Sequence, residues 1–109
     1  MEVRWSDEAT ETLAARCAHA VTYYFSKSGD VGFAQAQAES LDKEFRVFAE
    51  TLVNMPGKFL FYAHKGNPGC HKSPSFKGMV FIYSIETTPF GVEYIWVWDL
   101  LLPHQIELV

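Results

Sequence analysis

The sequence predicts an α+β domain, in which an N-terminal strand and an antiparallel helix hairpin pack on a C-terminal antiparallel sheet. The first half of the chain repeats apolar residues every three or four positions, which is the period of an amphipathic helix. The second half holds β-branched and aromatic runs, which favour strands. With 109 residues the chain can bury one core without metal or disulfide support, so we expect a single domain over residues 1–109.

The chain is expected to open with a strand over Glu2–Trp5, where polar and apolar residues alternate. Ser6 or Asp7 can cap the following helix, because either side chain can accept a hydrogen bond from a free N–H of the first turn. Gly29 supplies a stop, so the first helix should end near Lys27. One face of this helix carries Ala9, Leu13, Cys17, Ala20 and Tyr24.

A second helix is expected to begin before Phe33 and to end at the segment Asn54–Gly57. Pro56 disfavours helical backbone at the residue before it, and the glycine that follows tolerates a left-handed turn. The apolar face of this helix holds Phe33, Leu41, Phe45, Phe48 and Leu52. Because only a few residues separate the two helices, they should run antiparallel as a hairpin.

The remaining segments predict the sheet. Phe59–Ala63 is a short apolar run that favours a strand, whereas repeated glycines and prolines make His64–Ser75 an ordered loop. Met79–Ile85 and Val92–Trp98 are rich in β-branched and aromatic residues and should form the centre of the sheet. Thr87–Gly91 connects them as a hairpin loop.

Composition and charge limit the classes of function. Hydrophobic residues make up 49% of the chain, too many for a disordered protein, yet no run approaches the roughly 20 apolar residues of a membrane span. The N-terminus lacks the basic and apolar pattern of a secretion signal, so we expect a cytoplasmic protein without membrane contact. Cys17 and Cys70 should then be free thiols. The net charge of −4 argues against a broad nucleic-acid footprint, although residues 57–78 carry four lysines and no acid.

Four segments carry a resemblance to a known family. They are Val3–Ala9, where a strand enters a capped helix, Leu52–Gly57, which closes with proline and glycine, the apolar run Gly78–Ile85 with its tyrosine, and Glu93–Asp99 as a last strand. In this order they resemble the RelE/ParE family of bacterial type II toxin–antitoxin toxins. The resemblance implies that family's fold, a toxin role such as plasmid stabilization, and a cognate antitoxin as partner.

The family has two branches, and the chain resembles them unequally. The ribosome-dependent ribonucleases usually carry an arginine three residues before the tyrosine of the penultimate strand, and here Val80 stands at that position. Of the lysines on the strand before it, only Lys72 can be matched. The chain therefore looks more like the non-nucleolytic ParE-type branch, whose members inhibit DNA gyrase, or like a diverged member with altered activity.

The alternative is an enzyme, a metal-independent mRNA endoribonuclease that acts on the ribosome. Such an enzyme needs groups that move protons and stabilise charge on the phosphate, and the candidates are Lys72, His71, Lys77 and Tyr83. Lys58, His64 and Lys65 are candidate RNA-binding residues, because they lie in the same glycine-rich and proline-rich region. The competing interpretation is that the lysines and histidines are solvated loop residues, and that Tyr83 packs in the core.

The last strand offers a candidate binding surface. Tyr94, Trp96 and Trp98 share one face at a period of two. If the helices do not cover that face, it is an aromatic strip of the kind that binds an antitoxin or a second copy of the chain; otherwise it belongs to the core. A homodimeric, non-toxic interaction module on the same fold is thus a third possibility. The spacing of Cys70 and the nearby histidines matches no zinc pattern, so we expect neither metal nor cofactor.

Overall fold

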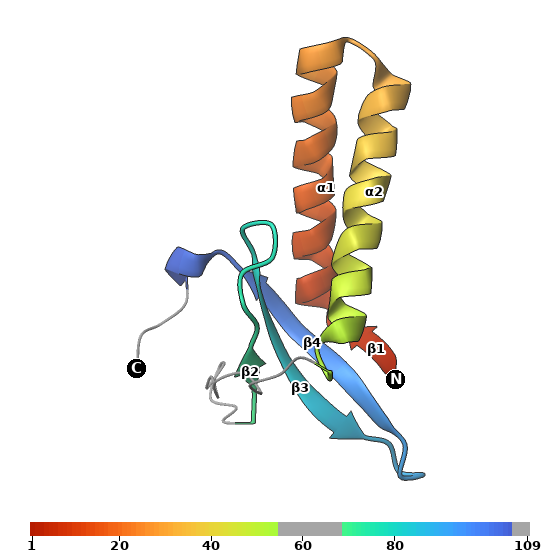
Figure 1. Ribbon diagram of the computed structural model, residues 1–109, viewed down its shortest axis with the longest axis vertical. Coiled ribbons are helices and arrows are strands. Elements are labelled where there is room, and N and C mark those ends of the chain that lie inside the picture. The colour runs from red at the N-terminus through yellow and green to blue at the C-terminus, as the bar shows by residue number, and fades with distance from the viewer. Residues whose placement is uncertain (55–68, 106–109) are drawn as a thin grey trace.

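A computed structural model describes residues 1–54 and 69–105 of the protein. The elements are β1 (Glu2–Trp5), α1 (Asp7–Ser28), α2 (Val31–Thr51), β2 (His71–Lys72), β3 (Val80–Thr87), β4 (Glu93–Leu101) and a single 3-10 turn at Pro103–Gln105. The strands form one sheet in the order β1-β4-β3-β2, and α1 and α2 form a hairpin that projects well beyond it (Figure 1). The α+β class, the first strand and the helix hairpin are therefore confirmed.

Some predicted features lie outside the described residues. They are the strand at Phe59–Ala63 and the binding candidates Lys58, His64 and Lys65. Within the described part of the chain, neither helix is long and apolar enough to cross a membrane.

Ser6 joins the start of α1 to the sheet. Its Oγ accepts a hydrogen bond from the backbone N–H of Ala9 at 3.0 Å and donates one to the carbonyl of Trp98 at 2.7 Å. The backbone N–H of Ser6 donates to the carbonyl of Val97 at 3.0 Å. One residue therefore caps the helix and fixes the position of its first turn on β4.

Replacing Ser6 with alanine should destabilise the protein by about 1–2 kcal/mol, because the cap and the bond to β4 are lost together. Urea unfolding followed by circular dichroism would measure this change. Ser26→Ala is the control, since its hydroxyl only contacts the carbonyl of Tyr23 on an exposed face of α1. That variant should stay within about 0.5 kcal/mol of the parent. Equal losses in the two variants would contradict the role given to Ser6.

The turn between the helices is closed by local hydrogen bonds. Gly29 has a φ of 67°, in the left-handed region, and its N–H donates to the carbonyl of Phe25 at 2.8 Å. Asp30 then caps α2 by accepting a hydrogen bond from the N–H of Phe33 at 3.1 Å. A glycine stop followed at once by an acidic cap forces the chain to reverse here.

The sheet departs from the prediction in two ways. β1 pairs in parallel with β4, with Val3 opposite Ile95, so the sheet is mixed. The expectation of a loop throughout His64–Ser75 is wrong at His71–Lys72, which pair antiparallel with β3. The first pairing joins the two ends of the chain, and the second joins His71–Lys72 to the strand that follows it. In both cases the stabilising partner lies outside the segment itself, so the pattern within that segment does not predict the pairing.

A β-bulge in β4 adjusts which side chains face the helices. Ile82 pairs with Asp99 but the next residue, Tyr83, pairs with Val97, so Trp98 is the extra residue. Because side chains alternate along a strand, an unbulged strand would turn Asp99 toward the helices. The bulge instead places Leu100 in the core.

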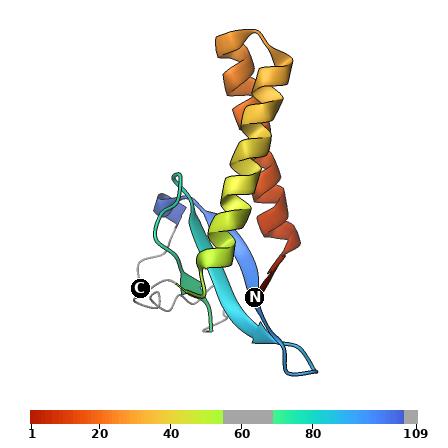
Figure 2. The same cartoon turned by 45° about the vertical axis from the view of Figure 1, so that its right-hand side comes forward.

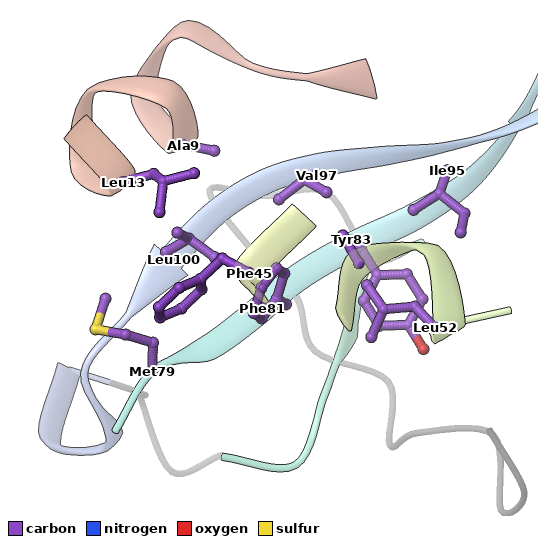
Figure 3. Packing of buried hydrophobic residues seen from close by; sticks show 11 residues of the cluster. Ala9, Leu13, Phe45, Leu52, Met79, Phe81, Tyr83, Ile95, Val97 and Leu100 are labelled. Atoms are coloured by element: carbon purple, nitrogen blue, oxygen red, sulfur yellow. The ribbon is translucent and has the colours of Figure 1, made fainter. Parts of the chain in front are cut away.

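The main core lies between the helix-facing side of the sheet and the halves of the helices nearest to it (Figure 3). Phe81 sits at its centre, with its ring 5.8 Å from that of Phe45, 5.0 Å from Phe48 and 5.9 Å from Trp5. The buried members of this cluster are Ala9, Leu13, Phe45, Ala49, Leu52, Met79, Phe81, Tyr83, Ile95, Val97 and Leu100. The core is therefore made by both halves of the chain.

The far half of the hairpin has no sheet beneath it (Figure 2). Its buried residues are the alanines Ala20, Ala34 and Ala38, and none of them belongs to the main core. Near the tip, the rings of Tyr24 and Phe33 meet edge to face at 6.0 Å. Small side chains let the two helices approach closely here, but they bury little apolar area.

Candidate interaction surface

The aromatic strip of Tyr94, Trp96 and Trp98 lies on the face of the sheet opposite the helices. Val97 and Ile95, which alternate with these residues, are buried in the core, whereas the three aromatic side chains stay partly exposed. The rings of Trp96 and Trp98 contact edge to face at 6.1 Å. Of the two interpretations of this face, the structure selects the one in which the helices do not cover it.

Polar contacts hold Trp98 in place. Its Nε1 donates a hydrogen bond to Oγ of Ser84 at 2.8 Å, and that hydroxyl donates onward to the Glu86 carboxylate at 2.7 Å. Ser84 is buried, and these two bonds satisfy both its donor and an acceptor site. The indole therefore has one defined orientation, with its apolar edge against a small second cluster that includes Val80 and Ile82.

The other end of the strip carries charge. The Arg4 guanidinium lies over the ring of Tyr94, 4.3 Å from its centroid, and bonds both carboxylate oxygens of Glu2 at 3.0 and 3.3 Å. The hydrogen bond from Arg4 and its positive charge hold the pKa of Glu2 below its usual value. The strip thus runs from an aromatic, apolar end to an ion pair at the edge strand β1.

The four candidate catalytic residues are divided between different parts of the sheet. His71 lies opposite Tyr83 on the helix-facing side, with the two rings 5.6 Å apart. Lys72 pairs with Ile82, so its side chain starts from the opposite face. Lys77 stands on the turn that leads into β3 and forms an ion pair with Glu44 of α2 at 2.7 Å. Only His71 and Tyr83 of the four are brought together.

Tyr83 is part of the core, with 4% of its surface exposed. Burial in the low-dielectric interior raises the pKa of its phenol to about 12. A phenol that holds its proton so firmly is a poor general base near neutral pH.

Lys77 occupies an unusual backbone position. It has a φ of 48° and is followed by Gly78 with a φ of 80°, in a two-residue turn closed by hydrogen bonds between Phe76 and Met79. Such hairpin turns need left-handed backbone at both central residues, a conformation that favours glycine or asparagine. The turn directs Lys77 toward the helices, where it borders a groove of about 580 Å³ with Phe48, Phe76 and Val47 along its apolar wall.

No group of three or more metal-binding side chains occurs among residues 1–54 and 69–105. Cys17 and Cys70 are unbridged. Comparison of the chain with protein-family models, with curated proteins and with solved structures found no match. The properties of the surface therefore rest on its own geometry.

The strip is framed by three polar residues that were not predicted from the sequence, namely Arg4, Ser84 and Glu86. Ser84 and Glu86 alternate along their strand, a weak signal that they share one face with each other. Arg4 reaches the strip only because β1 pairs with β4, where it lies opposite Trp96. A parallel pairing between the two ends of the chain leaves no local signal in the sequence.

Proposed function

We propose that this protein is the toxin component of a type II toxin–antitoxin pair with RelE/ParE architecture, which acts by binding its target and is silenced by a cognate antitoxin. The main support is the aromatic strip on the helix-free face of the sheet. Aromatic residues that stay partly exposed and are held rigidly are typical of protein-binding surfaces. The order of strand, helix hairpin and antiparallel strands agrees with the resemblance.

The distribution of the candidate catalytic residues favours binding over cleavage. Val80, at the position of the family's catalytic arginine, is buried against Ile82 on the outer face of the sheet. Tyr83 is buried on the other face, and Lys72 and Lys77 start from different elements. A single phosphodiester cannot easily reach all of these groups at once.

The proximity of His71 to Tyr83 favours one other function, that of a ribosome-dependent mRNA endonuclease. Replacing His71 and Lys72 together with alanine and glutamine should abolish RNA cleavage in an assay with ribosomes if this alternative holds. Unchanged cleavage would remove the proposed catalytic site. A purely structural homodimer is tested separately by light scattering at micromolar concentration, where a monomer would exclude it.

The proposed toxin function is tested by expressing the chain alone in bacteria, which should arrest growth. Trp96→Ser should relieve the arrest, because it removes a central ring of the strip without touching the main core. Phe90→Ser is the matched control, since Phe90 is 93% exposed on the β3–β4 turn and far from the strip's centre. This variant should still arrest growth.

Two results would count against the proposal. The first is normal growth with the unaltered chain, when the folded protein is shown to accumulate. The second is equal relief by Trp96→Ser and Phe90→Ser. If the arrest is seen, a supercoiling assay with purified gyrase and a translation assay will identify the target. The antitoxin is expected from an adjacent reading frame that encodes a short protein with a DNA-binding half and a disordered half.

A further inference from the structure

A second site lies on the helix hairpin, away from the aromatic strip. The turn that carries Lys77 stands beside the half of α1 that is nearest the sheet (Figure 1), and a cleft of about 560 Å³ is lined by both. Arg16, His19 and Tyr23 line it from one face of α1, Leu41 from α2, and Lys77 from the turn. Its size lies within the range of small-molecule sites.

The charge of this cleft is positive. Arg16 and Lys77 contribute cations, and no acidic side chain is among the residues that line the cleft in the described structure. Glu44 reaches Lys77 from the neighbouring groove and neutralises part of its charge. Lys27 adds a further cation nearby, with its Nζ 5.8 Å from the centre of the Tyr23 ring. In a chain with a net charge of −4, this is a local concentration of positive charge.

The Arg16 guanidinium has donors to spare. Nη2 makes a long hydrogen bond of 3.5 Å to the carbonyl of Lys77, while the buried Nε has no hydrogen-bond partner within the described part of the chain. Since the buried Nε is closed to solvent, a ligand in the cleft would have to bind the guanidinium through its Nη groups. The Nη groups of an arginine commonly donate charge-assisted hydrogen bonds to phosphate oxygens.

The aromatic wall of the cleft narrows the class of ligand. Tyr23 is 51% exposed, and its ring is braced edge to face by Tyr24 at a centroid distance of 5.1 Å. An exposed ring beside phosphate-binding cations is the combination that holds a nucleobase and its phosphate together. An acidic peptide would use the cations but would have no need of the ring.

We propose that this cleft binds a nucleotide, with the phosphate at Arg16, His19 and Lys77 and the base against Tyr23. This site is independent of the aromatic strip and goes beyond the proposed toxin function. Isothermal titration calorimetry on the full chain, with AMP, adenosine and inorganic phosphate as probes, tests it. AMP should bind more tightly than either of its parts, and equal binding of AMP and inorganic phosphate would overturn the assignment.

Substitutions distinguish specific binding of AMP in the cleft from nonspecific attraction of an anion to positive charge. Arg16→Gln should weaken AMP binding about tenfold, the effect of one charge-assisted hydrogen bond. Arg4→Gln, which removes the same charge at the distant edge of the sheet, should leave it unchanged. Equal losses in these two variants would overturn the proposal.

Two exposed positions keep the test valid if Arg16→Gln fails to fold. Tyr23→Ser should weaken AMP binding several-fold but leave inorganic phosphate binding unaltered, since only the base is expected on the ring. Glu44→Gln should strengthen AMP binding by releasing Lys77, whereas Glu39→Gln elsewhere on α2 should not. If either Tyr23→Ser or Glu44→Gln leaves AMP binding unchanged, the proposed site is contradicted.

A competition experiment distinguishes two sources of the nucleotide. A short single-stranded RNA that displaces AMP indicates that the cleft takes a nucleotide within a chain. Failure of the RNA to displace AMP, when AMP itself binds, indicates a free nucleotide.

Discussion

Phe81→Ala should destabilise the protein by about 3–5 kcal/mol, the usual cost of removing a fully buried phenylalanine ring. Phe81 has no exposed surface, and its ring contacts aromatic rings from both β1 and α2. Removing it leaves a cavity between the sheet and the helix hairpin that neighbouring rings cannot fill without leaving their rotamers. The midpoint of urea unfolding, followed by tryptophan fluorescence, measures the loss.

Phe90→Ala is the control for this substitution. It removes the same atoms from a side chain that is 93% exposed on the β3–β4 turn. Its effect on the free energy of unfolding should stay within about 0.5 kcal/mol. Similar losses at Phe81 and Phe90 would show that the core does not lie where the structure places it.

The second large effect is expected at alkaline pH. The pKa of Tyr83 is raised from 10.0 to about 12, so the unfolded chain loses this proton before the folded chain does. The contribution to stability is therefore complete below pH 10 and is lost as the pH rises toward 12. A shift of this size corresponds to about 2–3 kcal/mol of unfolding free energy.

Urea unfolding at a series of pH values between 9 and 12 would measure this loss, with pH values set by the shift of Tyr83. To isolate the effect of this one phenol, the comparison is with Tyr83→Phe, which retains the ring and lacks the ionisable group. Stability of the parent should fall more steeply than that of the variant. Parallel curves would mean that the Tyr83 phenol ionises as easily in the folded state as in the unfolded state.

The helices could be predicted well because their signals are local. Caps at Ser6 and Asp30, the stop at Gly29 and apolar residues at spacings of three and four all lie within the segments they control. The two long strands were predicted for the same reason. Their ends differ by a few residues, since β4 continues to Leu101 across the bulge.

The arrangement of the sheet was less accessible from the sequence. The segment around His71 contains several glycines and prolines, which predicted a loop. Pairing with β3 nevertheless makes two residues of this segment a strand. Likewise, a period of two placed Tyr94, Trp96 and Trp98 together but could not say which face the helices would cover. That choice depends on where α1 docks, which Ser6 sets through its bonds to β4.

The far half of the hairpin, where only alanines are buried among the described residues, should open locally more easily than the sheet. The buried side chains of the distal half of the hairpin are Ala20, Ala34 and Ala38, which bury little apolar area. The amide hydrogens near Gly29 should therefore exchange with solvent water much sooner than those of β3. The distal turns can then loosen and close again while the sheet remains intact, which would let the hairpin adapt its shape to whatever it meets.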